Sequence, residues 1–219
     1  MSEMTAEAQG VLWDMDGVLV DTGEAHFASW QQVLAERGVP FNRLDFARTF
    51  GMNNAGILAL LIGEDLSPEE VQAIGDRKEM LFRRLVKGDA RPLPGVLDWL
   101  ARLSTLGFRQ AIASSAPQEN IDVLVNELGI RDYFQAIVSG AKLPGKPHPD
   151  VFLEAARRIG VAPADCVVVE DAIAGVQAAR NAGMRCIAVT TTNSADKLSA
   201  ADMVVSSLEE LDEDAFWGR

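Results

Sequence analysis

From Pro92 onward, the sequence alternates short apolar runs with longer segments whose apolar residues recur at helical spacing. A further apolar run, 11–13, lies near the N-terminus and ends directly at Asp14. Strands that alternate with helices form right-handed βαβ units, in which helices cover both faces of a parallel sheet. We therefore predict an α/β fold with a mainly parallel sheet. The predicted strands are 11–13, 108–114, 135–138, 166–169, 185–189 and an edge strand at 202–205, and the predicted helices between them are 96–107, 117–129, 149–160 and 172–183.

The segment between the first predicted strand and Pro92 has a different pattern. Its apolar residues, among them Phe27 and Trp30, recur at helical spacing, and no run of strand character interrupts them. Ser67 followed by Pro68 and two glutamates is a typical helix start, because serine caps free N–H groups and the acids lie near the positive end of the helix dipole. We predict a Rossmann-like α/β core at residues 1–21 and 92–219, with an all-helical insertion at residues 22–91.

The charge balance narrows the range of partners. Twenty Lys and Arg against 32 Asp and Glu give a net charge of −12, which disfavours binding to nucleic acids and to anionic membranes. The longest purely apolar stretch, 57–62, is too short to span a bilayer, and the N-terminus lacks the pattern of a signal peptide. Cys166 and Cys186 lie in strand-like runs, which predicts buried thiols. We expect a soluble, cytoplasmic, monomeric protein whose partner is a small molecule.

Polar side chains follow the predicted strands at the points where those strands end. The carboxyl ends of parallel strands meet at one edge of the sheet, where such folds bind their ligands. Several carboxylates in one crevice would repel each other unless a divalent cation neutralised them, and carboxylate oxygens suit Mg²⁺. The sequence therefore predicts a magnesium site that can accept a phosphate group. The residues concerned are Asp14, Asp16, Ser114, Ser115, Lys146, Glu170 and Asp171.

These residue types suit phosphoryl transfer. The spacing of Asp14 and Asp16 allows one carboxylate to attack phosphorus while the other moves a proton at the bridging oxygen. Ser114 can donate to a phosphoryl oxygen, and Lys146 can stabilise charge on the phosphoryl group. Ser115 is a second candidate for a substrate contact at the same strand end.

The motifs resemble those of the haloacid dehalogenase superfamily of phosphotransferases. The chain carries, in order, D-x-D-G-x-x-x-D-T from Asp14, a strand-end serine, G-K-P-x-P-D around Lys146, and the pair Glu170-Asp171. Together the motifs extend from Asp14 to Asp171. The resemblance implies an aspartyl-phosphate mechanism and Mg²⁺ as the cofactor.

The resemblance also implies a role for each motif residue. Asp14 would be the nucleophile and Asp16 the general acid and base, and Ser114 and Lys146 would bind the transferring phosphoryl group. The metal ligands would be Asp14, the backbone carbonyl of Asp16, and Asp171, with Glu170 in support.

The helical insertion resembles the mobile cap of the superfamily's first subclass. Within it, residues 22–30 are similar to the T-x-E-x-H-F-x-x-W run of β-phosphoglucomutases. By this resemblance His26, Asn54 and Lys78 are candidate substrate contacts, with His26 at the junction of cap and core. Those mutases carry an arginine in a cap loop that grips the second phosphate, whereas the matching loop here, 51–54, contains none.

We therefore expect a Mg²⁺-dependent phosphohydrolase that acts on a small phosphorylated metabolite, with sugar phosphates as the first choice. The alternative is a β-phosphoglucomutase-type phosphotransferase, in which a sugar hydroxyl takes the phosphoryl group instead of water. Two other classes remain open. A metal-free dehalogenase would not need Asp16 or the pair Glu170-Asp171, and a non-catalytic phospho-receiver domain has a different motif order and no large helical insertion.

Overall fold

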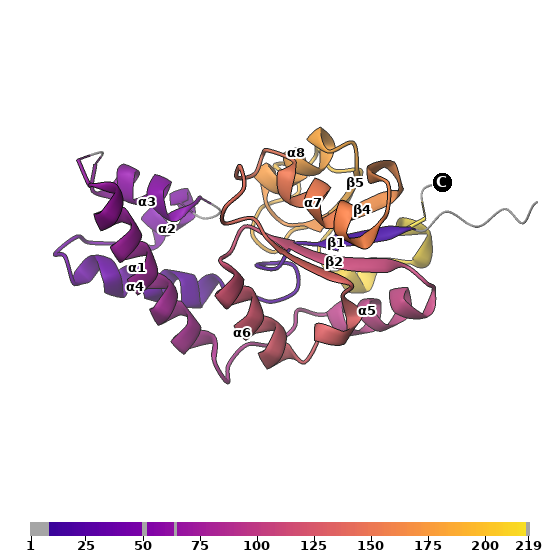
Figure 1. Cartoon of the computed structure of the whole chain (residues 1–219), viewed down its shortest axis with the longest axis horizontal. Coiled ribbons are helices and arrows are strands. Elements are labelled where there is room, and N and C mark those ends of the chain that lie inside the picture. The colour runs from indigo at the N-terminus through magenta and orange to yellow at the C-terminus, as the bar shows by residue number, and fades with distance from the viewer. Residues whose placement is uncertain (1–8, 50–51, 64, 218–219) are drawn as a thin grey trace, which may run out of the picture.

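The computed structural model describes residues 9–49, 52–63 and 65–217. Within these residues, six strands form one sheet in the order β3-β2-β1-β4-β5-β6, and every neighbouring pair is parallel. This confirms the predicted α/β fold with a parallel sheet (Figure 1). The strands are β1 (Gly10–Trp13), β2 (Arg109–Ser114), β3 (Ala136–Ser139), β4 (Cys166–Glu170), β5 (Arg185–Val189) and β6 (Met203–Val205).

Helices cover both faces of this sheet, α5 and α6 on one and α7 and α8 on the other (Figure 1). Successive side chains of a strand point to opposite faces, so Val11 and Trp13 pack with α5 and α6 while Leu12 packs with α7 and α8. Both faces are buried, which explains why the strands are apolar throughout rather than alternating. These helices are α5 (Val96–Thr105), α6 (Gln118–Leu128), α7 (Asp150–Ile159) and α8 (Ile173–Asn181), and short 3-10 turns cover Arg131–Tyr133, Pro163–Asp165, Leu208–Glu210 and Glu213–Ala215.

The segment between β1 and Pro92 folds into helices in its described part. It contains α1 (Gly23–Ala35), α2 (Arg43–Thr49), α3 (Asn54–Leu61) and α4 (Pro68–Val86), which lie beside the sheet domain in Figure 1. Phe27 and Trp30 are buried in a separate apolar cluster of this segment, as predicted. Ser67 begins α4 with a capping box, in which its side chain accepts from the Glu70 N–H and the Glu70 carboxylate accepts from the Ser67 N–H.

The two chain crossings between this helical segment and the sheet domain lie side by side. Val20 and Pro92 form an antiparallel bridge, and the Leu93 N–H donates to the Leu19 carbonyl at 3.1 Å. This pairing agrees with a boundary near residues 21 and 92. The division into core and cap nevertheless stays a prediction, and residues 1–8, 218–219 and Gly51 of the cap loop lie outside the described residues.

The sheet order explains why polar residues from distant segments meet. The chain moves outward from β1 to β2 and β3, and then returns to place β4 on the other side of β1. At such a reversal the loops after the two flanking strands separate and leave a crevice at the carboxyl edge. The ends of β1, β2 and β4 carry Asp14, Ser114 and Glu170 at this edge.

The expectation for the two cysteines is met. Cys166 and Cys186 are buried free thiols, and burial raises the pKa of Cys166 to about 12. Among the described residues, no helix is long and apolar enough to cross a membrane.

Trp13 is the last residue of β1 and directly precedes Asp14. Its indole Nε1–H donates to the Gln110 side-chain oxygen at 3.1 Å inside the core. Gln110 in turn donates to the Leu100 carbonyl and the Ser104 hydroxyl, both at 2.9 Å. Trp13 therefore brings a polar N–H group into the core together with its acceptor, Gln110.

We predict that Gln110→Leu lowers the free energy of unfolding by about 1–3 kcal/mol, because the buried Trp13 N–H loses its acceptor. Urea unfolding followed by circular dichroism would measure the change. The double variant Trp13→Phe/Gln110→Leu removes both polar partners and should be less destabilised than the sum of its single variants. A fully additive double variant would contradict the predicted coupling.

Candidate active site

Three buried carboxylates meet at the carboxyl edge of the sheet. Among the described residues, Asp14, Glu170 and Asp171 each offer an oxygen within 4.8 Å of the other two. Lys146, on the loop between β3 and α7, lies between two of them. Its Nζ donates to Asp14 Oδ1 at 2.6 Å and to Glu170 Oε1 at 2.5 Å. The structure thus brings these four residues together, and their chemical roles stay predictions.

The backbone fixes the orientation of Glu170. Its second oxygen, Oε2, accepts from the N–H groups of Asp171 and Ala172, both at 2.8 Å. Gly175 of α8 approaches the same carboxylate so closely that a Cβ there would lie 1.8 Å from Oε1. Both Glu170 oxygens therefore have hydrogen-bond partners, so Asp14 and Asp171 are better candidates for binding a cation directly.

The electrostatics of this cluster favour an added cation. Burial, together with the charges of Glu170 and Asp16, raises the pKa of Asp14 to about 7, although the charge and hydrogen bond of Lys146 act to lower it. Burial, Glu170 and Asp14 likewise raise the pKa of Asp171 well above its ordinary value. One ammonium does not balance three carboxylates, so the donor set fits a hard divalent cation that takes oxygen ligands.

Asp16 has a different environment on the loop after β1. Its Oδ1 accepts from the Thr22 hydroxyl at 2.5 Å and lies 3.4 Å from Nε2 of His26. Burial alone would raise the pKa of Asp16, but the hydrogen bond and charge of His26, the Thr22 hydroxyl and the charge of Lys78 lower it. The pKa values of the two motif aspartates therefore differ, since that of Asp14 is raised and that of Asp16 is lowered.

His26 connects Asp16 to a lysine of α4. Lys78 Nζ lies 2.9 Å from His26 Nδ1, and because an ammonium group can only donate, His26 accepts at Nδ1 and donates from Nε2 to Asp16. The imidazole also stacks on Phe82, with ring centroids 4.2 Å apart. His26 and Lys78, both predicted as substrate contacts, are thus brought into one chain of contacts with Asp16.

The remaining predicted substrate contacts are less tightly grouped. Ser114 is buried at the end of β2, where its hydroxyl accepts from the Ala116 N–H at 3.1 Å, and Ser115 is exposed. Asn54, at the start of α3, donates to Glu79 Oε1 at 3.0 Å. No contact ties Asn54 to the carboxylate cluster within the part of the chain that the structure describes, so its substrate role rests on the sequence resemblance.

The loop after β5 contributes residues that the sequence reasoning missed. The Thr192 hydroxyl donates to Asp171 Oδ2, and the Thr191 hydroxyl donates to the Gly17 carbonyl. Asn193 Nδ2 donates to the Asp171 carbonyl at 3.1 Å. Gly17 has a φ of +79°, and a Cβ there would lie 2.0 Å from Asp171 Oδ2, so this contact requires glycine. The Thr-Thr-Thr-Asn run directly after a predicted strand was the available signal.

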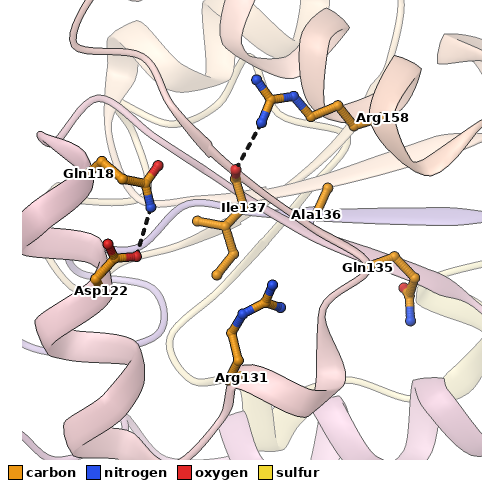
Figure 2. A pocket seen from close by; sticks show the side chains of 7 residues that line it. All are labelled: Gln118, Asp122, Arg131, Gln135, Ala136, Ile137 and Arg158. Carbon is orange, nitrogen blue, oxygen red and sulfur yellow. Dashed lines mark hydrogen bonds between the residues drawn. The ribbon is translucent and has the colours of Figure 1, made fainter.

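A separate hollow lies at the β3 edge of the sheet. Figure 2 shows Arg131 and Arg158 on two sides of it, with Gln118 hydrogen-bonded to Asp122 and Arg158 hydrogen-bonded to the Ile137 carbonyl. None of the predicted site residues lines this hollow. We therefore assign the candidate active site to the carboxylate cluster.

Comparisons with known proteins agree with this fold. The model of the haloacid dehalogenase-like hydrolases matches residues 8–183. The chain belongs to the haloacid dehalogenase-like hydrolase family, and it is an enzyme of that family.

Individual relatives cover nearly the whole chain. A β-phosphoglucomutase of Bacillus subtilis is 34% identical over 213 residues, which span 93% of this chain and 91% of that protein. A fructose-1-phosphate phosphatase of Escherichia coli is 32% identical over 184 residues, which span 82% of this chain and 95% of that protein. The crystal structure of a β-phosphoglucomutase from Clostridium difficile superposes with a TM-score of 0.85 at 25% identity, covering 94% of both chains.

We predict that Thr192→Val weakens divalent metal binding by about 10- to 100-fold, as loss of a hydrogen bond to a metal ligand typically does. The valine keeps the side-chain size but cannot donate to Asp171. Isothermal titration of Mg²⁺ into the chelator-treated protein would measure the affinity. Ser194→Ala, an exposed change two residues further along, is the control. Equal affinities in Thr192→Val and wild type would refute the bracing role of Thr192.

Proposed function

We propose that the protein is a Mg²⁺-dependent phosphatase of small phosphorylated metabolites, with sugar phosphates as its substrate class, and that Asp14 carries the phosphoryl group as an aspartyl-phosphate. The observation that carries this proposal is the meeting of Asp14, Lys146 and Asp171 at one sheet edge, with Asp16 beside them. Phosphoryl transfer needs carboxylates with different pKa values, an ammonium group and oxygen ligands that can hold a cation.

The metal would be held by Asp14, Asp171 and the backbone carbonyl of Asp16, with Glu170 and Thr192 orienting the ligands. When bound, Mg²⁺ would neutralise the carboxylates and the non-bridging oxygens of the substrate phosphate. Lys146 would lie against the same phosphate, since its Nζ already contacts Asp14 at 2.6 Å. Ser114, at the end of β2, would donate its hydroxyl to a further phosphoryl oxygen.

In the first step, a carboxylate oxygen of Asp14 attacks phosphorus and the bond from phosphorus to the ester oxygen breaks. Asp16 donates its proton to that oxygen, so the metabolite leaves as an alcohol. Asp16 is ionised in the free protein because its pKa is lowered. The negative phosphate of the bound substrate raises the proton affinity of Asp16, and the carboxylate takes up the proton that it then donates.

In the second step, Asp16 removes a proton from water, the water oxygen attacks phosphorus, and the bond to Asp14 breaks. Inorganic phosphate forms and Asp14 returns as a carboxylate. The hydrogen bonds from Thr22 and His26 favour the ionised form of Asp16 and therefore support its function as the base. The helices of the insertion would act as a cap that excludes bulk water and contacts the rest of the substrate.

β-Phosphoglucomutase-type transfer is the second candidate. Two observations support it: the similarity to the relative from Bacillus subtilis, and the contacts that join Asp16, His26 and Lys78. The mutase must also hold a second phosphate. The cap loop that would supply an arginine has Asn54 instead, and this amide is already bonded to Glu79. For this reason we favour hydrolysis over transfer.

The test is an assay of the purified protein with Mg²⁺ on β-glucose 1-phosphate, fructose 1-phosphate and short-chain phosphates, with free phosphate and glucose 6-phosphate measured together. We expect phosphate release from sugar phosphates that stops when a chelator is added. Asp14→Asn should lose all detectable turnover, and an active Asp14→Asn variant would refute the mechanism. Glucose 6-phosphate forming with little free phosphate would establish the mutase instead.

Metal binding should be visible in stability as well. Because the pKa of Asp171 is raised in the folded protein, its contribution to stability is complete below about pH 4 and is lost as the pH rises. We predict that Asp171→Asn melts at or above the wild-type temperature at pH 7.5 without metal, where relief of about 1 kcal/mol corresponds to roughly 2–4 °C. Differential scanning fluorimetry should show that Mg²⁺ raises the melting temperature of wild type but not of Asp171→Asn. A similar Mg²⁺ shift in both proteins would place the metal elsewhere.

A further inference from the structure

A buried polar network connects the helical insertion with the sheet domain. Glu79 of α4 accepts from Asn120 of α6, whose Nδ2 lies 2.6 Å from Glu79 Oε2. Arg83, one helical turn further along α4, donates to the oxygen of the same amide at 2.8 Å. One amide therefore joins two residues on one face of α4, and the opposite polarity of its two contacts fixes its orientation.

Glu79 also holds two groups of the insertion itself. It accepts from Lys78 Nζ at 3.1 and 3.2 Å and from Asn54 Nδ2 at 3.0 Å. Lys78, Glu79 and Asn120 are all buried, with exposures of 3%, 7% and 1%. A buried carboxylate needs several partners, because they replace the hydration that it loses on burial.

We propose that Glu79 is a positioning residue, which locks the insertion to the core through Asn120 and holds Lys78 for the non-reacting part of the substrate. This inference rests on the proposed function, since it concerns how the same site recognises a sugar phosphate. Asn120 lies in the first turn of α6, the helix that follows the Ser114 loop. Through this amide, movement of the insertion is coupled to the strand end that would bind phosphate.

The surroundings of Lys78 show why its neighbour must be negative. Its Nζ lies over the rings of Phe82 at 5.2 Å and Trp30 at 5.7 Å, and it contacts His26 at 2.9 Å. In the described part of the chain, Glu79 is the carboxylate within ion-pair distance of this ammonium, with Asp16 and the like charge of Arg83 acting from further away. Without Glu79, the ammonium would be buried without a compensating neighbour.

The kinetic experiment compares two phosphoryl donors. A sugar phosphate needs the insertion for recognition, whereas acetyl phosphate is small enough to react at the core alone. We expect Glu79→Gln to lower kcat/KM for the sugar phosphate by about 10- to 100-fold, the scale of a substrate held about 1 Å out of place. Its kcat/KM for acetyl phosphate should stay close to wild type. An equal loss with both donors would mean a merely structural role and would overturn the proposal.

Glu36→Gln is the matched control. Glu36 is an exposed carboxylate of the insertion whose partner is Arg77, at 2.8 Å, and Arg77 precedes Lys78 in the sequence. Loss of this exposed ion pair should leave both kcat/KM values within about twofold of wild type, because such pairs contribute little. A sugar-specific loss in Glu36→Gln equal to that of Glu79→Gln would overturn the assignment to Glu79.

Amide hydrogen exchange tests the link without any activity. Asn120→Asp keeps the side-chain size but brings two carboxylates together, so exchange should accelerate in both α4 and the first turn of α6. The double variant Glu79→Gln/Asn120→Asp reverses the donor and the acceptor and should restore the protection of α6. Failure of the double variant to restore it would overturn the link. If the wild type hydrolyses neither donor, the proposed function fails, and the exchange data still decide whether the two helices are joined.

Discussion

The candidate active site depends on the ion pairs that Lys146 makes with Asp14 and Glu170. Three carboxylates are brought together by strands that are far apart in the sequence, and the sheet can only bury them there if positive charge comes with them. The loop after β3 supplies one charge, at 2.6 Å from Asp14 and 2.5 Å from Glu170. The negative charge that remains is the reason why these carboxylates could hold a cation, as the proposed function requires. The backbone N–H groups that hold Glu170 and the β5 loop that holds Asp171 keep the cluster in register.

Much of this arrangement could be predicted because its signals are local. Apolar runs of strand length, helical spacing between them and a serine-capped helix start each depend on a few neighbouring residues, and all three proved reliable. The positions of Asp14, Lys146 and Glu170 followed from a single topological rule, that parallel strands end at one edge. Their convergence therefore needed no knowledge of side-chain geometry.

The parts that could not be predicted depend on contacts between distant residues of common types. Thr191 reaches Gly17 across 174 positions, and Asn120 reaches Glu79 across 41. A threonine in a loop or an asparagine at the start of a helix has a bland explanation in any sequence, as a turn or cap residue. No periodic sequence pattern distinguishes a threonine or asparagine that bridges two elements from one that does not. Asn54 shows the opposite case. The sequence resemblance predicts a substrate contact for it, whereas in the structure its amide donates to Glu79 of α4.

The bridge between Val20 and Pro92 has an evolutionary meaning. Because the chain leaves and re-enters the sheet domain at adjacent points, the sheet is topologically complete without the intervening segment, and its ends are already within the span of a short turn. Such an insertion can be lengthened, shortened or exchanged as one genetic unit without disturbing the strand order. The carboxylate cluster and Lys146 lie on the sheet-domain side of this junction. If the insertion selects the substrate, as the proposed function has it, exchange of this one segment would change the substrate and leave the reacting groups in place.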